Sequence, residues 1–147
     1  MPAPEGYHTV TPSLSVNDAP AIIQFLKDVF GATERHRLKS DDGKVMHAEV
    51  RIGDSTIMLG DACEGMGPSA ASLYVYVDDA DATYQRALEA GGTSAMEPAD
   101  MFWGDRMASV KDASGNSWII ATHVEDVSPE EIDRRARQFA QQAATQG

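Results

Sequence analysis

Cysteine, basic residues and long apolar runs are all scarce in this chain of 147 residues. Cys63 is the only cysteine, which excludes an internal disulfide framework and favours a cytoplasmic location. Lysine and arginine total 12 against 23 aspartates and glutamates, so the net charge of -11 leaves no basic footprint for nucleic acid. Residues 1–8 lack the apolar run of a signal peptide or membrane span. We therefore expect neither nucleic acid nor membrane as a partner.

Motifs of common catalytic machinery are absent as well. No Gly-x-Ser-x-Gly pattern introduces a nucleophilic serine, and no glycine-rich nucleotide fingerprint follows a strand pattern. Cys63 has no histidine or basic cluster nearby in the sequence that would activate its thiol. The sequence thus disfavours a triad hydrolase, a cysteine nucleophile and a nucleotide-dependent enzyme.

What the chain does contain is an internal repeat with an offset of about 61 positions. Residues 14–19 align in pattern with residues 75–80, and residues 57–59 align with residues 118–120. Two copies of one strand-helix-strands unit would each expose an apolar face. We therefore expect the two halves to pair and to leave a cleft between them.

The length and the 42% content of hydrophobic residues predict a single domain, 1–147, in the α+β class. We expect a first module over 9–60, a connection over 61–71, a second module over 72–122 and a C-terminal helix over about 128–142. Periodicity predicts helices at 19–30 and 79–90. Strands are expected at 11–16, 34–38, 45–52, 56–59, 72–77, 93–96, 106–111 and 117–122.

The C-terminal segment carries a clear helix start. Ser128 is placed as the cap and Pro129 at the first helical position. Ile132, Ala136 and Phe139 then give the helix a narrow apolar face, and the tail beyond it is expected to fray. This face would cover either the outside of the sheet or a partner subunit.

Alternation along the strands sorts the side chains onto two faces. The mainly apolar set is expected beneath the helices: Leu14, Val16, Met46, Ala48, Val50, Ile52, Ile57, Leu59, Leu73, Val75, Val77, Trp118 and Ile120. The mixed set is expected to line the cleft: Thr11, Ser13, Ser15, His47, Glu49, Met58, Ser72, Tyr74, Tyr76, Arg106, Ala108, Val110, Ser117 and Ile119. Hydroxyls and aromatic rings on one face favour a small-molecule cavity. The alternative is a polar sheet face in contact with water.

Two segments are candidate sites on this mixed face. His47 and Glu49 lie on one face of one strand, so they could supply a base or ligands; alternatively this histidine and glutamate form a hydrogen-bonded or salt-linked pair with Arg51 or Arg106. The segment from Phe102 to Arg106 brings two aromatic rings and a guanidinium to the predicted cleft mouth. Alternatively its rings pack a sheet end or a dimer interface, and Asp105 neutralises Arg106.

Several segments resemble motifs of one protein family. Leu-Ser-Val-Asn-Asp-Ala at 14–19, Tyr-Val-Asp-Asp-Ala at 76–80 and the turn Asp-Ala-Ser-Gly-Asn at 112–116 are similar to those of the vicinal oxygen chelate superfamily, which includes glyoxalases, extradiol dioxygenases and bleomycin-resistance proteins. Residues 46–49, 102–106 and 121–127 more narrowly resemble its PhnB-like branch. The resemblance implies two βαβββ modules that form a curved mixed sheet around a cleft, and a homodimer.

The metal positions of the superfamily's enzymes, carried over by this resemblance, fall on Thr11, Met58, Ser72 and Ile119. None of the four is a usual ligand of a divalent cation. The resemblance thus implies a glyoxalase/bleomycin-resistance-like protein that binds a small molecule in its cleft without a metal cofactor. The ligand-binding residues would be Met58, Ser72, Tyr74, Tyr76, Phe102, Trp103, Arg106 and Ile119.

Two other functions stay open at this point. One is a metal-dependent lyase or dioxygenase of the same superfamily, with a displaced divalent metal at His47 and Glu49 and with Glu49 as a general base. The other is a scaffold that only dimerises. The sequence leaves the question of catalysis undecided.

Overall fold

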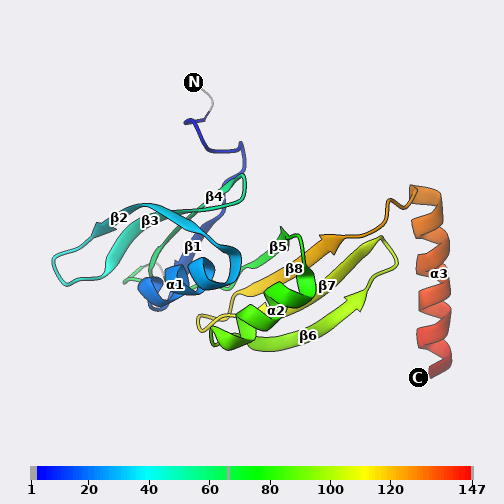
Figure 1. The fold of residues 1–147 in the computed structure, drawn as a ribbon. Helices are drawn as coiled ribbons and strands as arrows, with labels where there is room; N and C mark the ends of the chain where they lie inside the picture. The colour runs from blue at the N-terminus through cyan, green and yellow to red at the C-terminus, as the bar shows by residue number, and fades with distance from the viewer. Residues whose placement is uncertain (1–2, 66, 147) are drawn as a thin grey trace.

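A computed structural model describes residues 3–65 and 67–146 and places three helices and eight strands in them (Figure 1). The first module comprises β1 (Ser13–Val16), α1 (Ala19–Phe30), β2 (Thr33–Lys39), β3 (Val45–Ile52) and β4 (Ser55–Asp61). The second comprises β5 (Ser72–Tyr76), α2 (Ala80–Glu89), β6 (Thr93–Asp100), β7 (Asp105–Lys111) and β8 (Ser117–His123), followed by α3 (Pro129–Gln146). Among the helices described, none combines the length and apolarity needed to cross a bilayer.

Both modules have the same sheet topology. The strand orders are β1-β4-β3-β2 and β5-β8-β7-β6, with the first pair of each sheet parallel and the other pairs antiparallel. Parallel pairing needs a crossover, which α1 and the following strands supply in one module and α2 in the other. The predicted α+β class, the duplicated βαβββ unit and the C-terminal helix are confirmed.

The two module helices, α1 and α2, begin at acidic caps. Asp18 accepts a hydrogen bond from the amide of Ala21 at 3.2 Å, and Asp79 accepts one from Ala82 at 3.1 Å. Each bond satisfies a backbone donor that the first helical turn leaves without a partner. Gly31 ends α1 with a φ of 66°, a left-handed conformation that glycine adopts at little cost.

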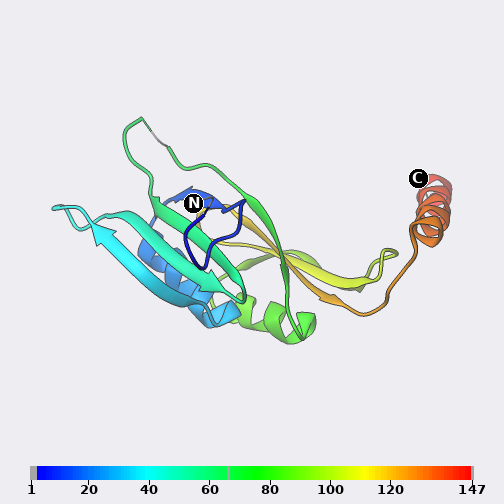
Figure 2. The ribbon, with the colours of Figure 1, turned by 90° about the horizontal axis from the view of Figure 1, so that it is seen from above.

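The two modules share one apolar core, and the helices form its centre. α1 packs beside α2 on the same side of both sheets (Figures 1 and 2). The ring of Phe30 in α1 lies 5.7 Å from that of Trp118 in β8, which is fully buried. A module-1 helix therefore contacts the sheet of module 2, and the modules are joined through their helices.

Because the helices join the modules, the two sheets do not close on each other. The structure contains two separate four-stranded sheets, and each keeps an open face away from the helices (Figure 2). Tyr76 on the second sheet is 62% exposed. The two sheets of one chain are therefore not closed around a common cleft, and each half presents its mixed face to solvent, although a groove remains at the junction of the modules.

Most of the predicted apolar face is buried as expected, but Met46 is 62% exposed. The register explains this, because Lys39 pairs with Val45 and Leu38 pairs with His47, which leaves Met46 as an extra residue in β3. A β-carbon on the neighbouring Gly60 would lie 2.6 Å from the Met46 carbonyl oxygen, so glycine permits this close approach.

The prediction of which β7 side chains face away from the helices is also wrong. Ala108 and Val110 are fully buried in the core, so they and Arg106 lie on the helix-covered face. Register places Ser109 beside Ile119 on the open face instead. Arg106, Ala108 and Val110 were therefore wrongly predicted to line the cleft.

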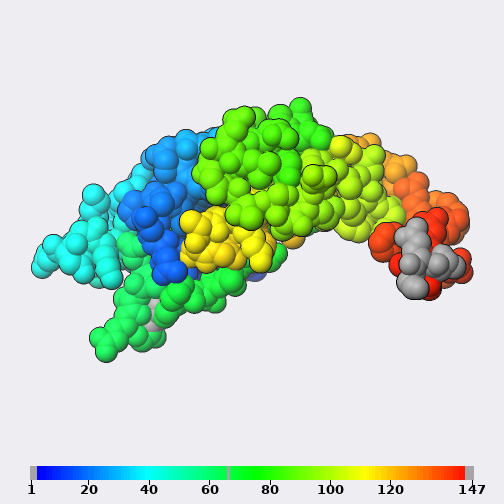
Figure 3. Space-filling model, turned by 90° about the horizontal axis from the view of Figure 1, so that it is seen from below, coloured from blue at the N-terminus to red at the C-terminus, as the bar shows by residue number. Residues whose placement is uncertain are grey.

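α3 runs further than predicted and stands apart from the two sheets. It continues to Gln146, beyond the predicted end at about residue 142. Figure 3 shows it at one end of an elongated molecule, with the β2–β3 hairpin at the opposite end. The helix does not cover the outside of a sheet, which was one of its two predicted positions.

Candidate functional site

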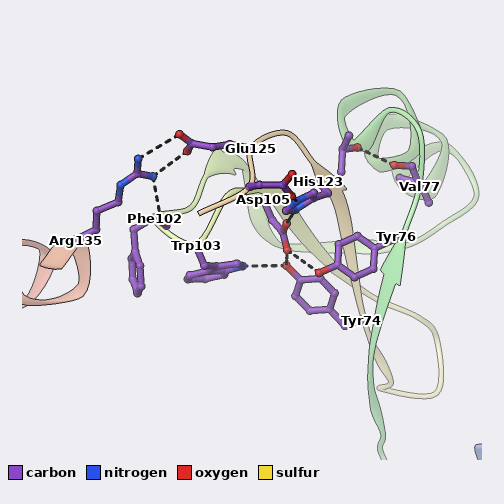
Figure 4. Close-up of polar contacts among 11 residues, drawn as sticks. Tyr74, Tyr76, Val77, Phe102, Trp103, Asp105, His123, Glu125 and Arg135 are labelled. Atoms are coloured by element: carbon purple, nitrogen blue, oxygen red, sulfur yellow. Dashed lines mark hydrogen bonds and ion pairs between the residues drawn. The ribbon is translucent and has the colours of Figure 1, made fainter. Parts of the chain in front are cut away.

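The open face of module 2 carries a hydrogen-bonded network centred on Asp105 (Figure 4). The Asp105 carboxylate is nearly buried, with 2% of the residue exposed. Tyr74 and Tyr76 donate their hydroxyl protons to its Oδ2 atom at 2.6 and 3.0 Å. Tyr74 and Tyr76 are two residues apart on β5, so both rings lie on the same face of the sheet. β8 lies between β5 and β7, and the tyrosine hydroxyls extend across it to reach Asp105 on β7.

His123 completes the network from β8, directly opposite Asp105 in the register. Its Nδ1 atom lies 2.9 Å from Asp105 Oδ1, and its Nε2 atom lies 2.7 Å from Asp126 Oδ1. The hydrogen bonds to Asp105 and Asp126 raise the pKa of His123 above its usual value. An imidazole with a carboxylate at each nitrogen is most stable as the doubly protonated cation.

The protonation states of this network follow from burial and hydrogen bonding. Burial alone would raise the pKa of Asp105, but the hydrogen bonds from Tyr74, His123 and Tyr76 outweigh it and lower that pKa. Burial and then the bond to Asp105 raise the pKa of Tyr74 to about 12, and the bond to Asp105 raises that of Tyr76. At neutral pH the carboxylate is therefore ionised and both phenols keep their protons.

Two further aromatic rings extend this surface from the loop between β6 and β7. The Trp103 indole donates its Nε1 proton to the Tyr74 hydroxyl at 3.3 Å, and the Phe102 ring meets Trp103 edge-on at 4.9 Å. The rings of Tyr74 and Tyr76 lie 5.2 Å apart at 53°. Because Asp105 holds both hydroxyls, these rings form a fixed aromatic platform on the open face of module 2.

Gly104 allows this loop to close beside the platform. Its φ is +103°, and a β-carbon there would lie 2.1 Å from the Glu125 carbonyl oxygen. The Gly104 carbonyl accepts hydrogen bonds from the amides of Val124 and Glu125 at 2.9 and 3.1 Å. The loop that carries Trp103 is therefore fixed to the segment that follows β8.

Arg106 lies away from the platform. Its Nε and Nη2 atoms donate to Asp81 of α2 at 2.7 and 3.0 Å, and its Nη1 atom donates to Asp100 at 3.1 Å. These carboxylates raise the pKa of Arg106. Its guanidinium is thus engaged on the helix side, and the aromatic rings of the 102–106 segment are the part that reaches the open face.

Module 1 has a smaller polar group on its own open face. His47 Nε2 lies 3.5 Å from Glu49 Oε1, and the Tyr7 hydroxyl donates to the same carboxylate. Arg51 instead donates to the Gly53 carbonyl at 3.1 Å. Glu49 thus contacts both His47 and Tyr7, and the predicted partner, Arg51 or Arg106, bonds elsewhere. The hydrogen bond from Tyr7 lowers the pKa of Glu49, which makes it a weaker general base.

A groove of about 1080 Å³ runs along the junction of the two modules. Ser72, Tyr74 and Tyr76 of β5 line one side, and the β3–β4 turn lines another. Thr11, Met58 and Ile119 are not among its lining residues. Met58 instead pairs with Glu49 on module 1, and Ile119 pairs with Tyr74 on module 2.

The four positions equivalent to superfamily metal ligands do not form a divalent-metal site. Thr11 precedes β1 and Met58 lies on β4 of the first sheet, whereas Ser72 and Ile119 belong to the second sheet. A hydroxyl, a thioether and an alkyl group are poor donors for a hard or borderline cation. In residues 3–65 and 67–146, no group of three or more His, Cys, Asp or Glu side chains is placed to hold a metal ion. The residues present do not fit the superfamily's metal.

Sequence reasoning missed Asp105 and His123 as the centre of the network. Asp105 was interpreted as a neighbour that neutralises Arg106, and His123 as part of a family motif. Two tyrosines on one partly covered face need hydrogen-bond partners for their hydroxyls. That requirement, combined with an aspartate beside the aromatic loop, is the signal that points to Asp105.

Comparison with known proteins agrees with this geometry. A family model described as the glyoxalase/bleomycin resistance protein/dioxygenase superfamily matches residues 7–120. The chain belongs to this superfamily. Among the curated relatives, uncharacterized protein Rv0887c of Mycobacterium tuberculosis (strain ATCC 25618 / H37Rv) is 37% identical over 134 residues, covering 84% of this chain and 79% of the relative.

Two solved structures of the same glyoxalase-like fold are similar at 25% sequence identity. TioX from Micromonospora sp. ML1 has a TM-score of 0.66, with 78% of this chain and 98% of that chain covered. TnmS3, an antibiotic binding protein from Streptomyces sp. CB03234, has a TM-score of 0.61, with 76% of this chain and 91% of that chain covered. α3 lies beyond the residues that match the superfamily model.

Proposed function

We propose that this protein binds a small aromatic molecule on the open face of module 2, without a metal, in the manner of an antibiotic-binding protein. The single observation that carries the proposal is the pair of outward-facing tyrosine rings whose hydroxyls Asp105 holds in place. Tyr74 is 40% exposed and Tyr76 is 62% exposed, although both hydroxyls are engaged. The similarity to the antibiotic binding protein TnmS3 supports the same class of ligand.

The chemistry of the platform favours a flat ligand that stacks. The polar atoms of Tyr74, Tyr76 and Trp103 already bond within the network, so the surface they offer is mainly the faces of their rings. Fixed rings lose little conformational entropy when a ligand binds. Asp105 and Asp126 beside the rings favour a ligand with a positive or polar edge.

The proposal includes a homodimer in the cytoplasm and placement in the PhnB-like branch. Residues 102–106 and 121–127, two of the three segments that resemble that branch, contribute Trp103, Asp105 and His123 to the network. The two sheets of one chain leave both faces open, so a second copy is needed to enclose a ligand. Module 1 of one copy would then cover the tyrosines of the other with the face that carries Met58, His47 and Glu49.

Titration with a panel of planar aromatic antibiotics, followed by calorimetry and Trp103 fluorescence, tests this function. Tyr76→Ala is expected to weaken binding about tenfold, because stacking on one ring contributes on the order of 1 kcal/mol. Tyr76→Phe keeps the ring and should bind within about threefold of the unmodified protein. Tyr84→Phe, which removes a hydroxyl bonded to Ser94, is the control and should change nothing. Equal affinity of the Ala and Phe variants at position 76 would contradict the proposal.

The metal-dependent alternative has its own test. A lyase or dioxygenase with a metal at His47 and Glu49 would retain a stoichiometric divalent ion after dialysis and lose it on His47→Ala. Metal analysis of the purified protein is expected to find no such ion. A retained ion that depends on His47 would replace the binding-protein proposal with the enzyme.

A further inference from the structure

The apolar face of α3 carries one of the exposed large apolar side chains of the described chain outside the aromatic platform. Phe139 is 62% exposed, and Ile132 and Ala136 on the same stripe are only half-buried. The helix is attached through its first half, where Arg135 bonds Glu125 at 2.8 Å and the Phe102 carbonyl at 3.2 Å. The Phe102 ring lies 5.8 Å from that of Phe139 and covers one side of it. The stripe is thus held in a defined orientation beside the platform while the ring of Phe139 stays exposed.

A second exposed apolar patch lies on the β2–β3 hairpin. Leu38 is 48% exposed and Met46 is 62% exposed, and the register places Leu38 opposite His47, next to Met46. The bulge at Met46 turns this side chain outward. The hairpin and α3 occupy opposite ends of the molecule (Figures 1 and 3), so the two patches cannot meet within one chain.

The two ends also differ in charge. Residues 33–51, around the hairpin, contain five lysines and arginines against four aspartates and glutamates. Residues 97–146, which include the platform and all of α3, contain five against nine. In a protein with a net charge of -11, the slightly basic hairpin segment therefore repels this acidic end less than the average of the chain does.

We propose that α3 of one copy packs its Ile132–Phe139 stripe onto Leu38 and Met46 of a second copy. This inference rests on the proposed homodimer and specifies its contact. A two-fold axis can pair the two molecules head to tail. The α3 helix of each copy then contacts the hairpin of the other, so the assembly is a closed dimer and does not extend into a polymer. Phe139 is the aromatic anchor, and the opposite charges of the two ends fix the orientation.

Directed disulfide formation between two differently tagged proteins tests the contact. Both carry Cys63→Ser, which removes the natural thiol; one carries Leu38→Cys and the other carries Phe139→Cys. A disulfide forms only where the two α-carbons approach to about 4.4–6.8 Å. Mixing and mild oxidation are expected to give a heterodimeric product. Replacing Phe139→Cys with Gln138→Cys, on the neighbouring side of α3, should give at least tenfold less.

Sedimentation equilibrium distinguishes failure of the α3 contact from failure of the proposed homodimer. A dimer that forms without the 38–139 cross-link would overturn the role of α3 and leave the dimer standing, whereas a monomer at all concentrations would overturn both. Phe139→Ser should weaken dimerisation at least tenfold with unchanged helical circular dichroism, and Gln138→Ser should have no effect. Antibiotic titration of the same variants reports separately on the small-molecule proposal.

Discussion

At the scale of single residues, Asp105 determines how the two tyrosines of β5 are presented. The two carboxylate oxygens of Asp105 have different partners: Oδ2 accepts a hydrogen bond from each tyrosine hydroxyl, and Oδ1 lies beside Nδ1 of His123. A hydrogen bond to a charged group contributes about 1.5–3 kcal/mol, and a buried polar partner left without one costs a similar amount. The network is therefore both a stabilising element and the support of the binding surface.

Asp105→Asn should release the tyrosines from this constraint. The amide has no negative charge, so the pKa of Tyr74 should fall from about 12 toward its ordinary value near 10. The free energy of unfolding should fall by about 2 kcal/mol. Absorbance of phenolate in a pH titration and urea unfolding measure the two effects. An unchanged tyrosine titration would show that burial alone raises the pKa.

His123 should make stability depend on pH in a defined window. Its pKa is raised in the folded protein, so the stabilisation is fully present below its unfolded value of about 6.5 and is lost as the pH rises through the folded value. His123→Gln should therefore lower the melting temperature more at about pH 5.5 than at about pH 8.5. His36→Gln, at an exposed position of β2, should show no such difference. The opposite ordering of the two pH values would exclude a charged His123.

At the scale of elements, the turn before β8 is held by a second buried carboxylate. Asp112 accepts hydrogen bonds from the Ser114 and Asn116 amides at 2.8 and 3.0 Å and from the Trp118 indole at 2.9 Å. The Asn116 side chain in turn bonds the Ala71 amide at 2.9 Å. One side chain thus connects the β7–β8 turn, the core tryptophan and the start of β5.

Removal of the Asp112 carboxylate should lower the free energy of unfolding more than is usual for a substitution in a turn. Asp112→Ala leaves several buried donors without acceptors, so it should lower the free energy of unfolding by about 3 kcal/mol. Asp41→Ala, in the exposed β2–β3 turn, is the matched control and should stay within about 0.5 kcal/mol. Chemical denaturation monitored by circular dichroism measures both. Similar losses in the two variants would mean that the hydrogen bonds of Asp112 contribute little.

The elements could largely be predicted from the sequence, because their signals are local. Asp18 and Gly31 set the ends of α1 without help from the rest of the chain. The phase of β7 could not be predicted, since Arg106, Ala108 and Val110 mix polar and apolar character in the same way as their alternates. Its phase depends on the pairing of Asp105 with His123, a contact between residues far apart in the sequence.

At the scale of the whole molecule, the arrangement of the modules was the main failure of sequence reasoning. A repeat shows that each half buries one face and opens the other, but both closed and open arrangements satisfy that pattern. The choice depends on side chains such as Phe30, which reaches Trp118 of the other module. The aromatic site was predicted only in part. Tyr74, Tyr76 and Trp103 could be recognised from the sequence, whereas the roles of Asp105 and His123 depend on the strand register, which the sequence does not specify.

The shared core predicts that the chain unfolds as one domain. Both tryptophans, Trp103 and Trp118, belong to module 2, so fluorescence reports on that module while far-ultraviolet circular dichroism reports on both. The two signals should give the same denaturation midpoint. Phe30→Ala should lower both midpoints together, with a loss of about 2 kcal/mol, because it removes a partly buried ring between the modules. Separate midpoints would show that 1–147 contains two independent units.

The joining of the modules through α1 and α2 has a consequence for how such proteins diversify. The residues that hold the halves together and the residues that present open faces are almost entirely different sets. Gene copies can therefore exchange rings and charges along β5 and β7 with little effect on folding, and selection for a new chemical target meets few constraints from the interior.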